Sequence, residues 1–219
     1  MAIIINGKEL AAKVRLELKE EVAELKKQGI QPKLAVIMVG NDGASAVYVR
    51  NKSKACDEIG IAFEEFLLEE DTTREELLNL IEELNHREDV HGILLQSPIP
   101  KHLDIREAFN AISYKKDVDG FHPINVGKLA IGEECLVSCT PTGVMKMLEE
   151  YHIETQGKNA VVIGRSNIVG RPLAQLLINS NATVTVCHSK TQNIAEITKK
   201  ADILVAAIRK AKICDREYG

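Results

Sequence analysis

The sequence has 219 residues, of which 45% are hydrophobic and 27% are charged, and this composition is ordinary for a globular protein with enough apolar material for a core. A formal net charge of −4 disfavours a general binder of nucleic acids, and no apolar run approaches the ~18–20 residues of a membrane span. The N-terminus lacks the basic and long apolar regions of a signal peptide, so we expect neither a nucleic-acid nor a membrane partner.

Apolar residues recur at three- and four-residue steps between Glu9 and Lys27, which predicts an amphipathic helix. Thr72 and Thr73 each precede a glutamate by three residues, the pattern of a capping box at the start of a helix. Along the first half of the chain we predict strands over 34–39, 61–68 and 90–96 and helices over 9–27, 44–59, 73–87 and 103–112. Because strands and helices alternate, crossover connections should produce a mostly parallel sheet covered on both faces.

The segment 113–138 is long and polar, and we predict a loop with the domain boundary at its end. Thr140 and Pro141 should begin a linking helix that runs to Tyr151. The second half then predicts strands over 159–164, 183–187 and 202–208 and helices over 170–179 and 192–200. Three strands amount to half of a doubly wound domain. The predicted fold is therefore α/β, with one domain over 1–138 and an incomplete Rossmann-like unit over 139–219.

The turn between Gly164 and Gly170 follows an apolar strand and precedes a helical pattern that starts with Gly170 and Pro172. A buried strand, a glycine-bounded turn and a helix form the arrangement that lays a phosphate on a helix N-terminus. The spacing differs from a strict G-x-G-x-x-G. Two interpretations stay open, namely dinucleotide binding and a plain βα turn whose glycines only shape the backbone.

Residues 188–191 follow the second strand of this unit, where an NAD-selecting domain usually places Asp or Glu for the ribose 2′-hydroxyl. No acidic residue occurs between Asn181 and Ala195, and Arg165 lies in the phosphate turn. A hydroxyl at Ser189 together with nearby cations suits a 2′-phosphate, so we predict NADP as the cofactor. The alternative is an exposed polar loop without a ligand.

Tyr48 and Lys52 are four residues apart in a predicted helix and therefore share one face. They form either an acid/base pair, if burial lowers the pKa of the lysine, or a tyrosine packed on a lysine stem. A Tyr-x-x-x-Lys pair also marks short-chain dehydrogenases, but there the cofactor turn precedes the pair. Gln96 ends a predicted parallel strand, at the edge where such sheets bind ligands, although loop backbone could also satisfy its amide.

Asp117 and Asp119 flank Val118 in the predicted loop. Two carboxylates this close are most often solvated turn formers. One of them, turned inward, could instead grip a donor–donor edge such as the amide and amine of a pterin, through paired charge-assisted hydrogen bonds.

The five cysteines contain no C-x-x-C motif, and Cys135 and Cys139 lack histidines at metal-ligand spacing. We interpret the cysteines as small buried hydrophobic residues and expect no metal site. An odd number of cysteines without a pairing pattern fits the reducing cytoplasm, where we expect the protein to reside.

Six motifs follow one another at residues 48–52, 92–100, 116–120, 139–143, 164–172 and 182–191. In content and order they resemble the bifunctional methylenetetrahydrofolate dehydrogenase/methenyltetrahydrofolate cyclohydrolase family. The resemblance extends from near the N-terminus to about Ile208. It implies NADP-dependent oxidation of 5,10-methylenetetrahydrofolate to 5,10-methenyltetrahydrofolate, followed by hydrolysis to 10-formyltetrahydrofolate.

The resemblance also implies roles for individual residues. Lys52 would be the catalytic lysine, Tyr48 would assist it and stack on the folate, and Gln96 would position the lysine. Asp119 would anchor the pterin ring. The residues expected to bind NADP are Gly164, Arg165, Ser166 and Ser189. The family fold has a folate-binding catalytic domain, here 1–138, and an NADP-binding domain, here 139–219, and is usually a homodimer paired through the cofactor domains.

The sequence departs from the family at Ser97, where leucine is common, and at Arg209, where the family places glycine beside the cofactor. Beyond Arg209 the remaining strands, substrate loop and last helix of the family are not found, so we interpret the chain as C-terminally truncated, with impaired activity or stability. A second hypothesis is a non-catalytic remnant that acts as a binding or partner subunit. A third is a shikimate-type dehydrogenase, which would not need the loop with Asp117 and Asp119.

Overall fold

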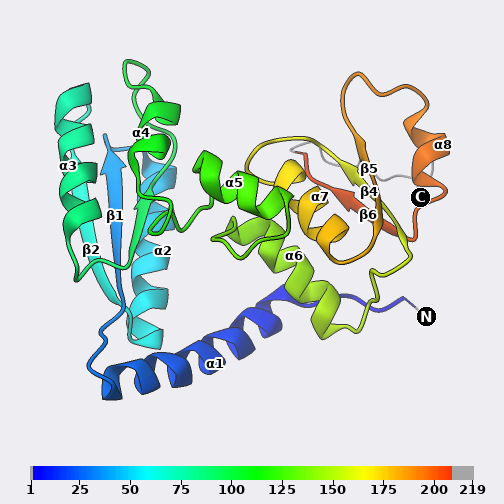
Figure 1. The fold of residues 1–219 in the computed structure, drawn as a ribbon, viewed down its shortest axis with the longest axis horizontal. Coiled ribbons are helices and arrows are strands. Elements are labelled where there is room, and N and C mark those ends of the chain that lie inside the picture. Colours follow the sequence, from blue (N-terminus) through cyan, green and yellow to red (C-terminus); the bar gives the residue numbers. More distant parts are fainter. Residues whose placement is uncertain (1, 209–219) are drawn as a thin grey trace. The chain divides into compact units, whose positions relative to one another are not determined.

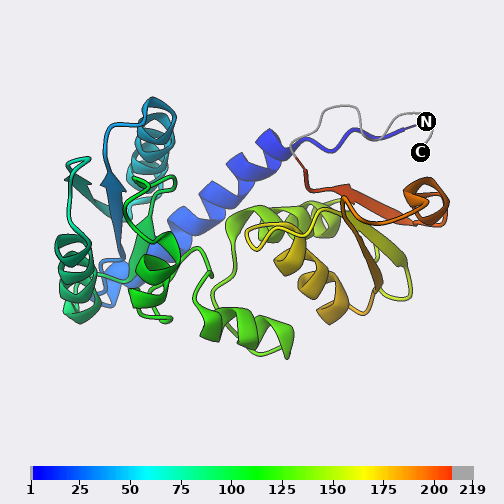
Figure 2. The ribbon, with the colours of Figure 1, turned by 90° about the horizontal axis from the view of Figure 1, so that it is seen from above.

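The computed structural model describes residues 2–208. Residues Asn6–Pro123 form one compact unit, and the described residues from Ile124 onward, with the first few residues of the chain, form a second. Each unit is built on a three-stranded parallel sheet (Figure 1 and Figure 2), which confirms the predicted α/β class. The predicted domain boundary after residue 138 falls inside the second unit, and Arg209 lies outside the described residues.

The first unit follows the predicted alternation, with element ends within a few residues of their predicted places. In chain order it contains α1 (Gly7–Lys27), β1 (Lys33–Val39), α2 (Gly43–Ile59), β2 (Ala62–Leu68), α3 (Arg74–His86), β3 (Gly92–Leu95) and α4 (Ile105–Ala111). The strand order is β2-β1-β3, so β1 is the central strand. The connection after β3 includes a cis peptide bond between Ser97 and Pro98.

The central strand β1 divides the core of this unit into two layers, because successive side chains of a strand point to opposite faces. Ala35 and Ile37 face the layer of α3 and α4, in which the fully buried Ile81 lies. Val36 and Met38 face the layer that holds Val49 of α2. Figure 1 shows α2 and α3 on opposite sides of β1. The sheet is therefore covered on both faces, as the alternation predicted.

Local capping explains where the helices of the first unit begin. Thr73 accepts a hydrogen bond from the backbone N–H of Glu76, and the Glu76 carboxylate accepts one from the backbone N–H of Thr73, which confirms a capping box at α3. Asn6 accepts from the N–H groups of Lys8 and Glu9 at the start of α1. Side-chain oxygens at these positions satisfy donors that a helix leaves unpaired.

The second unit has the same strand connectivity as the first. It contains α5 (Pro123–Ala130), α6 (Cys139–Glu150), β4 (Asn159–Ile163), α7 (Gly170–Asn179), β5 (Thr183–Cys187), α8 (Ile194–Thr198) and β6 (Ile203–Ala206). The strand order is β5-β4-β6. Leu148 of α6 and Leu173 of α7 pack on one face of the sheet, while α8 packs on the other. α6 and α7 lie side by side in both views (Figure 1 and Figure 2).

Two sequence expectations in this region are wrong. The predicted loop over 113–138 contains helix α5, in which Asn125 and Leu129 are buried one turn apart. Thr140 does not cap α6, because the helix already begins at Cys139 with Ser138 as the cap residue. The Ser138 hydroxyl donates to the carbonyl of Ile168, 3.0 Å away, and so serves a tertiary contact instead of the helix end.

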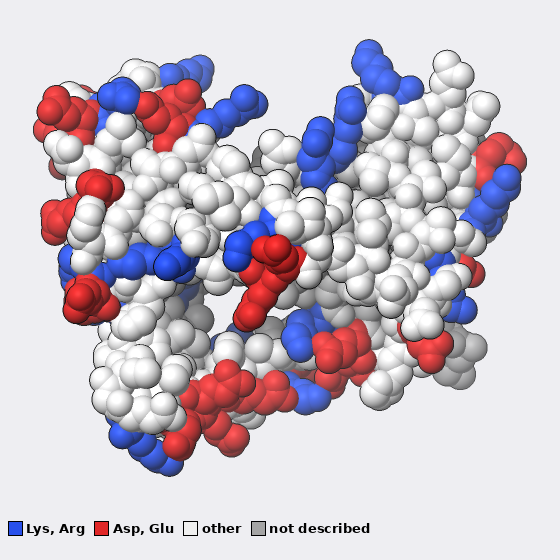
Figure 3. Space-filling view, in the orientation of Figure 1, with Lys and Arg blue, Asp and Glu red and all other residues white. Residues whose placement is uncertain are grey.

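The described surface carries both charge signs. On the face shown in Figure 3, acidic and basic side chains are interspersed among uncharged residues. Among residues 2–208, no helix combines the length and the apolar character that crossing a bilayer requires.

Candidate active site

Helix α2 carries the predicted pair Tyr48 and Lys52. The helix begins after Asp42, whose carboxylate accepts a hydrogen bond from the Ser45 backbone N–H over 2.8 Å, and this bond lowers the pKa of Asp42. Val49 is buried against the sheet, and Lys52 lies one turn further along the same side, half-buried. Tyr48 is 63% exposed, so the structure leaves its ring available to a ligand and does not pack it against the core.

Lys52 and Gln96 meet across the sheet edge. Gln96 follows β3 directly, and its backbone N–H donates to the carbonyl of Ile37 in the central strand over 2.8 Å. The Lys52 ammonium nitrogen donates to Gln96 Oε1, also over 2.8 Å. Gln96 Nε2 donates to the carbonyl of Ser97, which leaves Oε1 turned toward the lysine. The Gln96 backbone is thus fixed to the central strand and its side-chain amide to Ser97, and the amide oxygen holds the lysine in turn.

Asp117 anchors the segment that follows α4. It forms a parallel bridge with Ile93, so this segment runs along the outer edge of β3. Its side chain is only 3% exposed, and Oδ2 accepts a hydrogen bond from the backbone N–H of His122 over 2.8 Å. The preceding Lys116 donates through Nζ to the carbonyls of Leu84 and Arg87 at the end of α3. Both side chains therefore fix the segment in place.

Asp119 is the second aspartate of this segment, and its surroundings differ. Burial raises the pKa of Asp119 to about 6, the positive charge of Lys52 opposes this shift, and the negative charge of Asp117 adds to it. The Asp119 carboxylate therefore lies within electrostatic reach of Lys52. Residue types alone left the two aspartates equivalent, and only the resemblance singled out Asp119. In the structure Asp117 is the one that anchors its own segment.

Lys52, Gln96 and Asp119 therefore form one group of polar side chains at the carboxyl edge of a parallel sheet, where open α/β sheets bind ligands. Tyr48 stands one helical turn from Lys52 on the more exposed part of α2. The group offers an amine that can exchange protons, an amide that directs it and a carboxylate that can accept two hydrogen bonds. Within residues 2–208 no cluster of His, Cys, Asp and Glu is arranged to hold a metal ion.

The predicted phosphate turn in the second unit is tight and needs glycine at both ends. Gly164 has a φ of +120°, a backbone conformation that residues other than glycine rarely adopt. A Cβ atom on Gly164 would collide with the carbonyl of Ala207, and one on Gly170 would collide with the carbonyl of Gly164. The Ser166 hydroxyl accepts from the N–H groups of Val169 and Gly170 at 3.2 and 3.4 Å and so closes the turn.

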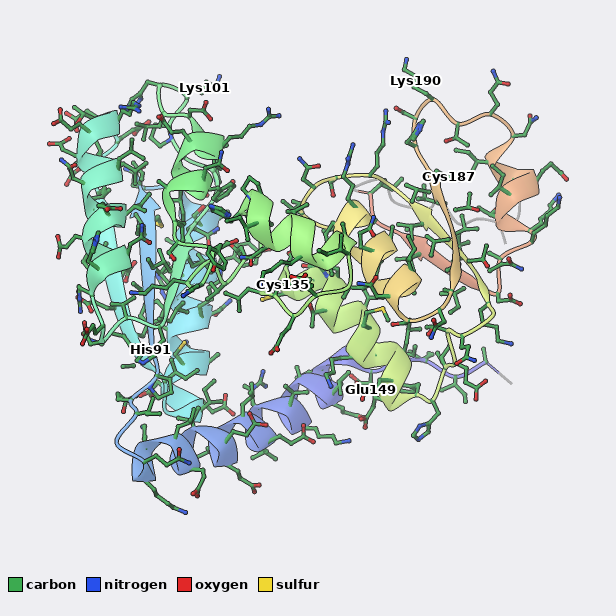
Figure 4. All side chains as sticks on the ribbon, in the orientation of Figure 1. His91, Lys101, Cys135, Glu149, Cys187 and Lys190 are labelled. Carbon is green, nitrogen blue, oxygen red and sulfur yellow. The ribbon has the colours of Figure 1, made fainter. Side chains whose placement is uncertain are left out.

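The remaining predicted cofactor residues lie on exposed loops. Arg165 and Ser166 follow Gly164 in the turn, and Ser189 follows β5. In Figure 4, Cys187 lies at the end of β5 and Lys190 extends outward from the loop beyond it. A glycine turn at the start of a ten-residue helix, with exposed cations and hydroxyls, fits the phosphates of a dinucleotide, including a 2′-phosphate.

Gly92, Lys116 and Val118 lie in the motifs at 92–100 and 116–120, but the sequence alone indicates no role for them. Lys116 caps α3, and Gly92 leaves the space that Val118 fills. A glycine at the start of a predicted buried strand was the available signal, because glycine inside a strand often marks a close approach of another chain segment.

Known proteins match nearly the whole chain. Residues 5–119 match a family model described as tetrahydrofolate dehydrogenase/cyclohydrolase, catalytic domain, and residues 138–218 match the NAD(P)-binding domain of the same family. The bifunctional protein FolD of Acetivibrio thermocellus is 58% identical over 209 residues, which cover 95% of this chain and 73% of that protein.

Solved structures of the same family are also similar to this chain. The bifunctional enzyme FolD, methylenetetrahydrofolate dehydrogenase/cyclohydrolase, from Campylobacter jejuni has a TM-score of 0.92 at 50% identity and covers 94% of this chain and 73% of its own. The Trypanosoma brucei enzyme FolD, solved with NADP cofactor and an inhibitor, has a TM-score of 0.89 at 39% identity, with coverages of 95% and 72%. These matches confirm the predicted resemblance, and the chain belongs to the tetrahydrofolate dehydrogenase/cyclohydrolase family.

Proposed function

We propose that this chain oxidises 5,10-methylenetetrahydrofolate with NADP and hydrolyses the resulting 5,10-methenyltetrahydrofolate to 10-formyltetrahydrofolate. The observation that carries the proposal is the hydrogen bond of 2.8 Å between Lys52 and Gln96, at a sheet edge that also presents Asp119. A positioned amine and a half-buried carboxylate are groups that can transfer protons to and from a bound pterin. Membership of the family supports both reactions.

In the cyclohydrolase step, water adds to the methenyl carbon and the bond from that carbon to N5 breaks. Lys52 relays one proton from the attacking water to N5 as the ring opens. The second proton of the water is released to solvent, which balances the loss of the methenyl positive charge. Gln96 accepts one N–H of Lys52 and so holds the nitrogen in place for this transfer.

The dehydrogenase step needs a hydride acceptor, which NADP held by residues of the second unit would supply. The residues that we assign to NADP are Gly164, Arg165, Ser166 and Ser189. Arg165 and Ser189 would hold the 2′-phosphate, and their exposed positions on neighbouring loops support this assignment. The Ser166 hydroxyl, which accepts two backbone N–H groups, can still donate its proton to a phosphate oxygen.

Asp119 serves as the anchor of the pterin, and Tyr48 stacks on the folate. An ionised carboxylate can accept a pair of hydrogen bonds from the amide and amine of the ring. With a pKa of about 6, Asp119 is mostly ionised at neutral pH, and donors on the pterin would favour the ionised form further. The 63% exposure of Tyr48 supports a role in ligand contact.

The test is to replace Lys52 by Met and to measure both reactions. We expect the cyclohydrolase rate to fall by roughly 10²–10⁴-fold, the range that general acid–base catalysis contributes. Lys54→Met is the matched control, because Lys54 is exposed on the same helix. Unchanged hydrolysis in Lys52→Met would contradict the assignment. A parent chain that binds folate and NADP without turnover would instead favour the alternative of a binding subunit.

We assign folate binding and catalysis to residues 1–138 and NADP binding to residues 139–219. The positions of Lys52 and Asp119 in the first compact unit, and of the turn at Gly164 in the second, support this division. Isothermal titration of NADP against Asp119→Asn and Gly164→Ala checks it, because only the second substitution should weaken NADP binding.

We further infer a homodimer that pairs through the cofactor units and works in the cytoplasm. β5 lies at an edge of its sheet, and an edge strand presents N–H and C=O groups that a second copy can pair with. Among the described residues, Cys56, Cys135 and Cys187 are free thiols, which suits a reducing compartment. Light scattering on the purified chain should give twice the monomer mass, and a single-chain mass would exclude the dimer.

A further inference from the structure

We propose that Gly92 and Val118 are positioning residues, whose contact sets the Asp119 carboxylate at its place beside Lys52. The inference rests on the proposed function, because it gives a role in folate binding to two residues that touch neither reactant. It concerns the first unit alone, in which all four residues lie.

The contact between Gly92 and Val118 has no spare room. Gly92 begins β3, and a Cβ atom built on it would lie 2.5 Å from Cγ1 of Val118. Such a distance is far below the ~3.5–4.0 Å at which carbon atoms pack best. Leu34, on the neighbouring strand, would lie at 3.4 Å, which is ordinary contact. Val118 is thus the neighbour that any side chain at this position would displace.

Val118 cannot move without cost, because it is part of the core. It packs with Val36, Val49 and Leu94 in the layer between the sheet and α2. A β-branched side chain also has few allowed rotamers, so rotation alone does not readily remove the clash. An Ala at position 92 would therefore push the backbone of Val118 away from the sheet.

The displacement passes directly to Asp119, the next residue in the chain. Lys116, Asp117 and Val118 hold three different parts of the fold, namely the end of α3, the N–H of His122 and the core beside Gly92. Asp119 is the first side chain after these anchors. Because a misplacement of about 1 Å in a positioned group can cost roughly 10²-fold in rate, the fit at Gly92 becomes a determinant of activity.

The test is a double-mutant cycle with Gly92→Ala, Val118→Ala and the double variant. In the double variant the methyl group at 92 would meet the remaining Cβ of residue 118 at 3.9 Å, an ordinary contact. We expect Gly92→Ala to lower kcat/KM for 5,10-methenyltetrahydrofolate by roughly 10²-fold. Val118→Ala should cause a smaller loss, and the double variant should recover most of the activity lost in Gly92→Ala.

Gly127→Ala is the matched control, because a Cβ there meets open space. A second readout follows the site without any substrate. The pKa of Asp119, read from the pH dependence of its carboxyl ¹³C signal, should fall toward the ordinary aspartate value in Gly92→Ala. It should return toward about 6 in the double variant.

The outcomes separate the two proposals. A double variant as impaired as Gly92→Ala, or an unaltered pKa of Asp119 in Gly92→Ala, overturns the positioning role. If Gly92→Ala fails to fold, the clash with Val118 is the cause only if the double variant folds. A double variant that also fails to fold overturns the proposal. If the pKa follows the cycle but the parent chain does not turn over folate, the positioning contact stands and the proposed function fails.

Discussion

Replacing Asp119 by Asn should make the protein more stable above pH 6 while it weakens folate binding. Burial raises the pKa of Asp119 from the ordinary 3.8 to about 6, so the folded state resists ionisation of this carboxyl. Between these two values the folded chain holds the proton more firmly than the unfolded chain, and stability falls as the pH rises. The penalty is absent at pH 3, grows between pH 4 and 6, and is complete at pH 8.

The size of the effect follows from the shift. A difference of about 2 pKa units corresponds to at most about 3 kcal/mol, since one unit is worth ~1.4 kcal/mol. Asn has the shape of Asp without the charge and therefore carries no such penalty. The gain of Asp119→Asn over the parent should increase by up to about 3 kcal/mol between pH 4 and pH 8. Folate affinity should fall in the same variant, because the carboxylate that accepts the pterin donors is lost.

Urea unfolding of both chains at pH 4, 6 and 8 measures the free energies directly. Asp57→Asn is the control, because Asp57 is exposed on α2 and its carboxylate lies in water in both states. A difference between Asp119→Asn and the parent that stays constant across this pH range would refute the reasoning. The Asp119 carboxyl would then not be held in a desolvated place, and its role beside Lys52 would need another explanation.

Three further predictions concern other parts of the chain. Arg87 and Lys33 lower the pKa of the exposed Asp89, so Asp89→Asn should be less stable than the parent at neutral pH. In urea titrations this difference should begin to shrink as the pH falls below about 4 and should be lost only well below that value. Thr73→Ala removes the capping box of α3 and should lower the free energy of unfolding by ~1 kcal/mol; an unchanged urea midpoint would contradict the role of the cap. Arg165→Ala should weaken NADP roughly 10- to 100-fold and leave NAD binding unchanged, which titration calorimetry with both cofactors decides.

The sequence was sufficient wherever a local pattern decides the structure. Apolar periodicity located α1, and the threonine–glutamate spacing located the start of α3, where the structure selects Thr73 over Thr72 as the cap. It failed for α5, where Pro123 and Gly127 suggest a loop and where the burial of Asn125 and Leu129 supplies the stabilisation that propensity does not. It also failed at Thr140, because the tertiary contact of Ser138 with Ile168 is invisible in a linear pattern.

The site shows the same division between local and distant information. Motifs brought Lys52, Gln96 and Asp119 to attention, and the structure joins Lys52 to Gln96 by a hydrogen bond and leaves Asp119 within electrostatic reach of Lys52. Residue types alone could not assign different duties to Asp117 and Asp119, because both stand in one short polar run. The resemblance singled out Asp119, and the structure adds the hydrogen bond that Asp117 accepts from the backbone N–H of His122. Burial of a polar side chain depends on contacts that the chain makes only after folding.

The single bridge between Ile93 and Asp117 has a dynamic consequence. β1 is paired with β2 along its whole length and with β3 over residues 34–37, whereas the segment with Asp119 is bridged to β3 at one position. Hydrogen exchange should therefore be slowest in β1 and faster around Asp119, since short-lived local opening begins where pairing is least. Opening would bring the carboxyl into water, where it ionises at its ordinary pKa, so a rise in pH favours the opened form. Low pH therefore favours the closed segment and high pH the opened one. Pterin donors that hydrogen-bond to the ionised carboxylate would stabilise the closed segment at high pH, as the proton does at low pH.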